Sequence, residues 1–282
     1  MTDAIKGIDH CVILVRDLAR ARDSIAALGF TVTPRGTHSA HMGTANHCIM
    51  LRQGYFELMA VLSPTEVNQR WRKLLAVREG LSAVPLATDD VDAVREALAS
   101  RGLTPSDPVA FSRPVELPEG RREAAFRIVL IPDEETPGST MFVCQHLTRE
   151  LVWHPDYLDH ANGALGLRAV TAVHDHPPEV APAYGKIFGP SAVAVSGDEV
   201  SIESGAGELR FVTPQAYGAR YPGLAPEPAA TPPYLAALSL DVGDVEATAA
   251  YFHERAVPHS VLAQGSLCVA PAAACGTLLE FV

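Results

Sequence analysis

The chain has 282 residues, a formal net charge of −11 and an isoelectric point near 5.4. This acidity, without any basic cluster, argues against nucleic acid as a partner. No uncharged apolar run reaches the roughly 18 residues of a membrane span, and the first residues do not resemble a signal peptide. We therefore expect a cytoplasmic protein with no membrane partner. Its 5 cysteines lack a C-x-x-C spacing and are expected to be reduced core residues.

A predicted helix that begins at an aspartate and ends at a glycine recurs along the chain. From Asp17, apolar residues at helical spacing lead to Gly29, which is typical of an aspartate N-cap and a glycine just past the helix end. The same pattern leads from Asp90 to Gly102 with the same spacing. The chain therefore repeats one unit. Further copies begin at Asp175, where the match is weaker, and at Asp244.

Short apolar segments broken by turn residues flank each of these helices, and they predict strands. Each unit is therefore β-α-β-β-β, and such units can pair into compact domains. The predicted strands after the helices are residues 31–33, 46–51 and 55–61 in the first unit, 124–131 and 140–145 in the second, 192–195, 199–203 and 208–212 in the third, and 260–262, 266–270 and 277–282 in the fourth.

The strand that opens the first unit differs from its counterparts because it carries a histidine, His10. This residue lies seven positions before the aspartate that starts the helix. The same count in the other units leads to Ala83, Arg168 and Ala237, and none of these is an imidazole. The pattern therefore predicts chemistry in the first unit.

With these repeats, and with Gly43-Thr44-Ala45-Asn46 leading into a strand, the chain resembles the vicinal oxygen chelate superfamily of glyoxalases, extradiol dioxygenases and bleomycin-resistance proteins. It is most similar to the glyoxalase-like members, over nearly its whole length. The resemblance implies an α+β fold of four βαβββ modules paired into two open barrels. The first domain would be residues 1–148 (modules 7–61 and 81–148), followed by a linking segment, 149–165, and a second domain, 166–282 (modules 166–214 and 234–282).

The resemblance also implies a divalent metal held by the first and last strands of a module, where this chain has His10 and Glu57. Both lie in apolar strands, where a carboxylate is costly unless it is paired or coordinates a metal. Alternation puts Tyr55 on the same face as Glu57. Imidazole and carboxylate suit Zn, Fe, Mn, Ni or Co, with open positions for a substrate. A hydrogen bond between the two side chains is the alternative.

A third ligand is expected on the last strand of the second unit. His146 and Gln145 are adjacent there and point to opposite faces of the strand. His146 is favoured, because imidazole binds divalent metals more readily than a neutral amide does. Gln145 fits the register of the family about as well and stays open as the alternative.

The second pair of units has no histidine at the position of His10, although Glu280 occupies its last strand. We therefore expect the second domain to lack a metal. Its expected roles are to complete the scaffold, to cover the first barrel or to form an oligomer contact, as in a homodimer.

Further residues are candidates for substrate binding. Arg113 and Arg127 could each pair with an anionic substrate, but surface salt bridges are the favoured explanation for both. Trp153 lies in a linking segment too apolar for a flexible tether and is expected to pack at the cavity rim or between the domains. Tyr55 is included because it shares the face of Glu57.

These features favour a metal-dependent enzyme whose ion chelates neighbouring oxygens of a small organic substrate, as in an isomerase, a lyase or a dioxygenase. Glu57 is the candidate catalytic residue, as a ligand or as a general base. The alternative is a metal-free protein that binds and sequesters a small molecule, similar to the bleomycin-resistance branch. In that case His10 and Glu57 would only form hydrogen bonds.

Overall fold

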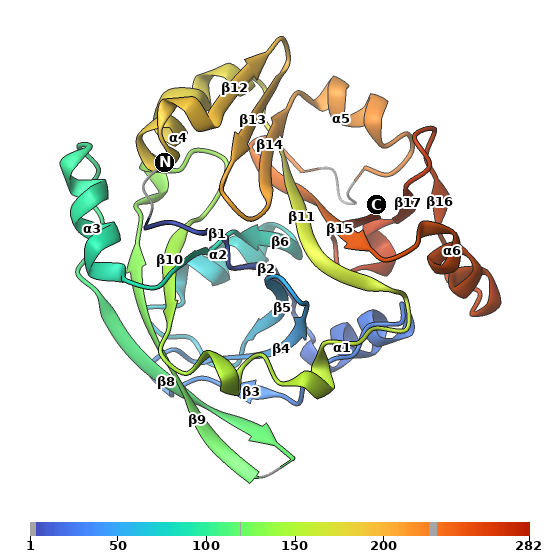
Figure 1. Cartoon of the computed structure of the whole chain (residues 1–282), viewed down its shortest axis with the longest axis horizontal. Coiled ribbons are helices and arrows are strands. Elements are labelled where there is room, and N and C mark those ends of the chain that lie inside the picture. The colour runs from blue at the N-terminus through green and yellow to red at the C-terminus, as the bar shows by residue number, and fades with distance from the viewer. Residues whose placement is uncertain (1–3, 119, 226–229) are drawn as a thin grey trace.

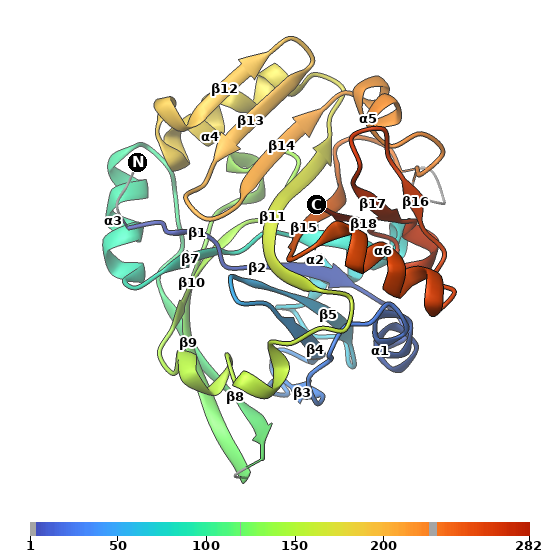
Figure 2. The same ribbon diagram turned by 45° about the vertical axis from the view of Figure 1, so that its right-hand side comes forward.

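The computed structural model describes residues 4–118, 120–225 and 230–282. These residues form a mixed α+β structure in which most helices lie at the periphery of curved sheets (Figures 1 and 2). No helix within these ranges is long and apolar enough to cross a membrane. The helices are α1 (Leu18–Ala27), α2 (Gln69–Val77), α3 (Val91–Ser100), α4 (Ala181–Phe188), α5 (Pro214–Arg220) and α6 (Val245–Glu254).

Three helices begin where the sequence predicts, because an aspartate caps each of them. The carboxylate of Asp17 accepts a hydrogen bond from the backbone N–H of Arg20 at 3.0 Å, and Asp90 and Asp244 cap α3 and α6 in the same way. The predicted start at Asp175 is wrong. The chain first passes through a 3-10 turn there, and α4 begins later without a side-chain cap.

The second half of the chain, residues 164–282, forms one sheet of 8 strands in the order β12-β13-β14-β11-β15-β18-β17-β16. Its central strands β11 and β15 are the first strands of their modules and pair antiparallel. The strands are β11 (Ala164–Val173), β12 (Val193–Ser196), β13 (Glu199–Glu203), β14 (Glu208–Val212), β15 (Tyr234–Val242), β16 (Ser260–Val261), β17 (Leu267–Val269) and β18 (Leu278–Phe281).

The first half, residues 4–148, forms two sheets, in the orders β3-β4-β5-β2-β6 and β1-β7-β10-β9-β8. The chain passes from one sheet to the other at Asp9, between β1 and β2, and again at Val84 and Pro85, between β6 and β7. The strands are β1 (Gly7–Ile8), β2 (His10–Leu14), β3 (Gly36–Thr37), β4 (Thr44–Met50), β5 (Tyr55–Val61), β6 (Gly80–Ala83), β7 (Leu86–Thr88), β8 (Val109–Leu117), β9 (Gly120–Leu130) and β10 (Phe142–His146).

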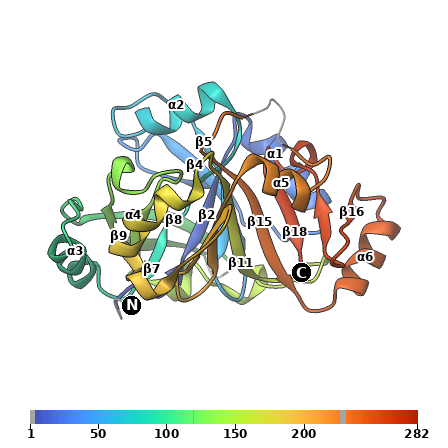
Figure 3. The same ribbon diagram turned by 90° about the horizontal axis from the view of Figure 1, so that it is seen from above.

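When β1 is joined to β2 and β6 to β7, the strand order of the first half equals that of the second. The α+β class with four βαβββ modules paired into two open barrels is therefore confirmed. The hairpin of β8 and β9 extends from the body of the molecule (Figure 1), and α3 and α6 lie at opposite ends of the view from above (Figure 3). The domain boundaries stay a prediction.

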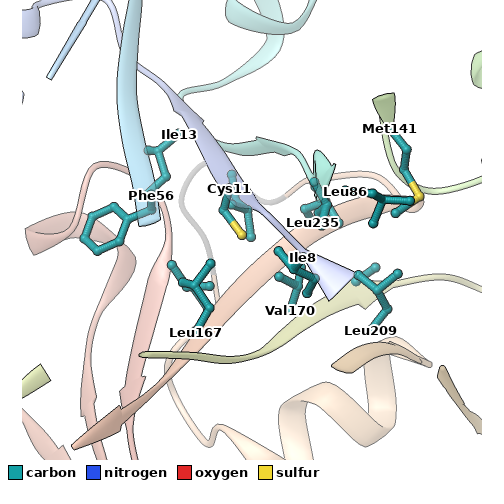
Figure 4. Close-up of a cluster of buried hydrophobic side chains, with 14 of the residues drawn as sticks. Ile8, Cys11, Ile13, Phe56, Leu86, Met141, Leu167, Val170, Leu209 and Leu235 are labelled. Carbon is teal, nitrogen blue, oxygen red and sulfur yellow. The ribbon is translucent and has the colours of Figure 1, made fainter. Parts of the chain in front are cut away.

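One apolar core joins the two halves. Ile8 and Cys11, from the first strand of the first half, lie beside Leu167 and Val170 of β11 (Figure 4). Backbone hydrogen bonds also cross between the halves, as from the N–H of Ile8 to the carbonyl of Ala206 at 2.7 Å. The backs of the two sheet systems are therefore buried against each other, and each keeps its concave face for other contacts.

Some sequence expectations for the elements were wrong. Residues 31–33 are not a strand, and the short strand β3 lies further along the chain. Helix α2 and the long strand β8 were not predicted: α2 lies in the connection between the first two units, and β8 lies between α3 and the next assigned strand, where none was assigned.

Candidate metal centre

A buried carboxylate, Asp9, lies between two histidines in the first half. Its Oδ2 accepts a hydrogen bond from Nδ1 of His10 at 2.6 Å and from Nε2 of His146 at 2.9 Å. The donor roles follow from the ionised carboxylate, which can only accept. Asp9 is 3% exposed, so these two imidazoles provide its solvation.

The gap between β1 and β2 explains why neighbouring residues reach the same site. In an uninterrupted strand, the side chains of Asp9 and His10 would point to opposite faces. Pro85 on the facing strand has no N–H to continue the ladder, and the N–H of Asp9 donates to the carbonyl of Pro85 at 2.9 Å. The strand is interrupted there, and the side chains of both residues meet beside β10.

The electrostatics of Asp9 favour its charged form. Burial alone would raise the pKa of this carboxyl, but the hydrogen bonds from His10 and His146, together with their charges, hold the pKa well below its usual range. Asp9 therefore keeps its negative charge at neutral pH, and a metal cation could balance it.

Cys144 completes a group of potential metal ligands. One donor atom each from Asp9, Cys144 and His146 lies within 4.8 Å of the others. Among the described residues, this is the group of histidine, cysteine and acidic side chains that lie close enough together to hold a metal ion. Burial, followed by the charges of Asp9 and Glu57, raises the pKa of the Cys144 thiol well above its usual value. The thiol is therefore protonated at neutral pH unless a metal displaces its proton.

Aromatic side chains enclose this group. The ring of Tyr55 stacks on His10 with 4.4 Å between centroids, and Trp153 and Phe126 each contact the ring of His146 edge-on at 5.0 Å. The indole N–H of Trp153 donates to the carbonyl of Leu51 at 3.0 Å, which fixes the linking segment over the site.

A cavity of about 360 Å³ reaches Asp9 and His146 from outside. It lies where the start of the chain, the turn after β4 and the linking segment meet the second half. Arg149 and Lys6 supply positive charge at its walls, and Lys6 pairs there with Asp89, so Arg149 is the cation of the lining that faces no carboxylate in an ion pair among the described residues. Its lining comprises Lys6, Ile8, Asp9, Gln53, Gly54, Ala87, Thr88, Asp89, His146, Arg149, Trp153 and Ala206.

His10 and Glu57 share a face of the sheet but have separate partners. In the parallel pairing of β2 with β5, His10 lies opposite Tyr55 and Glu57 lies opposite Val12. The carboxylate of Glu57 accepts a hydrogen bond from Nδ2 of Asn46 at 2.5 Å. The structure therefore brings His10 to His146 through Asp9, and it does not bring Glu57 into that group.

The amide of Gln145 lies on the other face of β10, toward α3. It donates to the carbonyl of Asp89, and its oxygen accepts from the N–H of Val91 at 3.5 Å. Gln145 therefore contacts the start of a helix, and His146 is the residue of this pair that the structure brings to Asp9.

The two candidate arginines have different surroundings. Arg127 forms a bidentate ion pair with Asp92 at 2.7 and 3.0 Å on the protein surface, as the favoured interpretation expects. Arg113 does not, so that interpretation is wrong for this residue. It is only 8% exposed and lies against Cys48 and the ring of Phe126 inside the first barrel.

The second half also buries a carboxylate, on β18. Glu280 is 1% exposed and accepts hydrogen bonds from the hydroxyls of Tyr221 at 3.0 Å, Ser239 at 2.5 Å and Ser266 at 3.0 Å. Tyr221 directly follows α5 and is itself buried, so the end of this helix supplies one of the three hydroxyls.

Asp9 and Cys144 were missed by sequence reasoning. Asp9 precedes His10 directly, and in a continuous strand its side chain would point to the face opposite that of His10. Pro85, at a position that should pair with it, is the signal that could have revealed the interruption. Cys144 shares the face of His146 two residues away, but buried cysteines are common in cores and carry little information alone.

The donor set fits a divalent metal. Carboxylate, imidazole and thiolate are all ligands of zinc and similar ions. Nδ1 of His146 is buried and has no partner among the described residues, which is unusual for an imidazole nitrogen. The hydrogen bond of His10 to Asp9 is the kind of support that usually holds a metal ligand in position.

The paired βαβββ modules place the chain among the open-barrel proteins. The buried carboxylate, imidazole and thiol give it a candidate metal centre. The sequence matches the model of the glyoxalase-like domain family over residues 8–188. The chain therefore belongs to the glyoxalase-like domain family of the vicinal oxygen chelate superfamily, whose members generally use a divalent metal. None of the curated proteins matches it.

Solved structures share the fold at low identity. A hypothetical protein from Staphylococcus aureus is 13% identical, with a TM-score of 0.65 and 98% of each chain covered. A xylose isomerase-like TIM barrel/4-hydroxyphenylpyruvate dioxygenase fusion protein is 12% identical, with a TM-score of 0.57; 99% of this chain matches 48% of that one. A mutant of 4-hydroxymandelate synthase from Streptomyces coelicolor is 12% identical, with a TM-score of 0.51 and coverages of 91% and 76%. These identities show the fold alone.

Proposed function

We propose that the protein is a divalent-metal-dependent enzyme whose ion is held by Asp9, Cys144 and His146 and binds neighbouring oxygens of a small organic substrate. The observation that carries the proposal is the approach of these three donors within 4.8 Å of one another, at the end of a cavity. A buried, charged carboxylate with Nε2 of His146 only 2.9 Å away supports it further, because the two atoms could share one ion.

The contacts of each residue define its role in the proposed site. The ion, when bound, would act as a Lewis acid on a substrate oxygen. His10 would hold Asp9 in its ligating position through the hydrogen bond at Nδ1. Trp153 would cover the site, and Arg149 at the cavity wall would attract an anionic substrate.

The donor chemistry favours one reaction class within the superfamily. Non-haem iron oxygenases typically use two histidines and one carboxylate, whereas here His10 contacts Asp9 but stands outside the group of three donors, whose third member is a cysteine, a ligand that zinc accepts readily. We therefore propose a redox-neutral isomerase or lyase that uses zinc, in preference to a dioxygenase.

Metal analysis of variants tests this assignment. Purified wild-type protein should hold one equivalent of zinc, and His146→Gln should lose it. Glu57→Gln should keep it, because Glu57 contacts Asn46 and not the proposed ligands. The exposed His253 on α6 offers the matched control His253→Gln, which should also keep it. Loss of metal in Glu57→Gln with retention in His146→Gln would refute the assignment.

A metal-free binding protein is the second candidate, and one observation favours it. His10 and Glu57 already have protein partners, Asp9 and Asn46, and aromatic and sulfur-containing side chains fill much of the first barrel. If zinc, iron, manganese, nickel and cobalt are all absent from protein purified without chelators, and added zinc does not bind, this candidate replaces the first.

A further inference from the structure

Arg149 forms a cationic wall of the cavity that leads to Asp9 and His146. Its guanidinium lies over the ring of Trp153, with the guanidinium carbon 3.4 Å from the ring centre. Such stacking fixes the plane of a guanidinium but leaves the N–H groups along its edge available. None of the described residues accepts a hydrogen bond from these groups or forms an ion pair with them. Arg149 is exposed, so an anion that enters the cavity can reach it.

The other charged groups of the cavity wall have partners. Lys6 pairs with Asp89, so these two charges cancel. Asp9 belongs to the proposed metal centre, where the ion would balance its charge. Within the described part of the chain, the positive charge of Arg149 is therefore the one in this lining that no neighbouring group balances. An arginine of this kind is a recognition group for a carboxylate, which can accept two parallel hydrogen bonds from it.

The indole of Trp153 joins Arg149 to the proposed metal centre. Its ring contacts the ring of His146 edge-on, with 5.0 Å between the centroids, and its N–H is held by the carbonyl of Leu51. The guanidinium and the imidazole therefore touch the same aromatic side chain, and both line the cavity. A small molecule could reach both.

The size and walls of the cavity limit the ligand. About 360 Å³ has room for a small organic molecule. The aliphatic side chains of Ile8, Ala87 and Ala206 line part of it, and they suit a short hydrocarbon segment. The cavity therefore combines a proposed ion, a separate cation and an apolar wall.

We propose that the substrate is a small dicarboxylate with an oxygen on the carbon next to one of its carboxylates. This inference rests on the proposed function, because that carboxylate and its neighbouring oxygen would be the two oxygens that bind the ion. The second carboxylate would pair with Arg149, and the short carbon chain would lie against the aliphatic wall. Arg149 would then determine specificity by charge, at a point away from the reacting atoms.

Three acids of matched chain length test the proposal by calorimetric titration of the purified full chain with one equivalent of zinc. The first, 2-oxoglutarate, has both features; 2-oxopentanoate lacks the second carboxylate, and glutarate lacks the oxo group. We expect 2-oxoglutarate to bind with one-to-one stoichiometry and about tenfold more tightly than 2-oxopentanoate, which corresponds to one charge-assisted contact. Glutarate should also bind more weakly than 2-oxoglutarate. Equal affinity for the two oxo acids, or no binding of 2-oxoglutarate, would overturn the proposal.

A variant assigns the second carboxylate to Arg149. Arg149→Gln removes the charge at an exposed position, and it should lower the affinity for 2-oxoglutarate to that for 2-oxopentanoate, whose own affinity should not change. Arg168→Gln is the matched control, since Arg168 is exposed and pairs with Asp241 in the second half, and it should keep the preference. A preference that survives in Arg149→Gln contradicts the proposal. Equal losses for both acids contradict it too, because Arg149 would then act only by supporting Trp153.

Removal of metal separates this test from that of the metal centre. After chelation and dialysis both oxo acids should bind more weakly, but the preference for the second carboxylate should persist, because Arg149 is not among the proposed ligands. If chelation changes neither affinity while the preference still depends on Arg149, the proposed metal-dependent function fails and the carboxylate contact of Arg149 stands.

Discussion

The two halves of the molecule have the same strand order, and each buries a carboxylate, yet the groups that solvate these carboxylates differ. Asp9 in the first half accepts from two imidazoles. Glu280 in the second half accepts from three hydroxyls. The fold is therefore compatible with two different uses of a buried acid.

The hydrogen-bond partners of the two carboxylates differ in whether they can release a proton and bind a metal ion in its place. An imidazole can give up its proton and bind a cation with the same nitrogen, whereas a hydroxyl is a weak metal ligand at neutral pH. The environment of Asp9 can therefore change from a hydrogen-bonded group to a coordination site. That of Glu280 is complete as it stands and favours a structural role.

The largest effect is expected from Asp9→Ala. Removal of this carboxylate leaves two buried imidazoles without their acceptor, and it should lower the free energy of unfolding of the metal-free protein by about 3 kcal/mol at neutral pH. Zinc binding should be lost as well. Urea unfolding and metal analysis measure the two effects, and a variant that is as stable as wild type would contradict the role assigned to Asp9.

The same variant has a pH signature. Because the pKa of Asp9 is lowered on folding, its contribution is present above the usual range of an aspartate and is lost as the pH falls toward the folded value. The stability difference between wild type and Asp9→Ala should therefore shrink on acidification. A difference that grows instead would mean that Asp9 is protonated in the folded protein.

Glu280→Leu should have the next largest effect, and only on stability. Three buried hydroxyls lose their common acceptor, which should cost about 2 kcal/mol in urea unfolding. Metal content should not change, because the residue lies outside the proposed centre. A loss of metal in this variant would remove the contrast between the halves.

Cys144→Ser should change metal affinity more than stability. A hydroxyl replaces a thiolate ligand, so zinc affinity should fall by roughly tenfold or more, while unfolding shifts by about 1 kcal/mol at most. Competition with a chromophoric chelator measures the affinity. Unchanged affinity would restrict the centre to Asp9, His146 and solvent.

Arg127→Met should have the smallest effect. The guanidinium already pairs with Asp92 at the surface, where ion pairs contribute little. Zinc content and the free energy of unfolding should both stay close to the wild-type values. A clear loss of stability would mean that this ion pair contributes more than a surface contact usually does.

Sequence reasoning predicted the features that depend on local chemistry. The aspartate caps of α1, α3 and α6 are properties of a few adjacent residues, and β5, β13 and β14 begin and end where alternation places them. His10 was predicted from its place before the first helix and from the family resemblance, and His146 was favoured for the metal affinity of imidazole; the structure joins the two through Asp9.

Features that depend on how distant strands meet could not be predicted in this way. Interruption of the first strand requires Asp9 and Pro85 to face each other, and a single chain pattern does not show that pairing. The burial of Arg113 has the same cause, since it follows from the approach of β8 to β3. In both cases the sequence shows which residue is present, but the tertiary structure determines what surrounds it.

The common apolar core has a consequence for how this protein could change over time. Strand β2, which begins with His10, is supported from behind by side chains of β11 and β15. A substitution in the second half can therefore shift the strand that carries the histidine, even if the second half binds nothing itself. Selection on catalysis would then restrain drift even at positions of the second half that lie outside the cavity, and a separated first half would expose the apolar back of its own site.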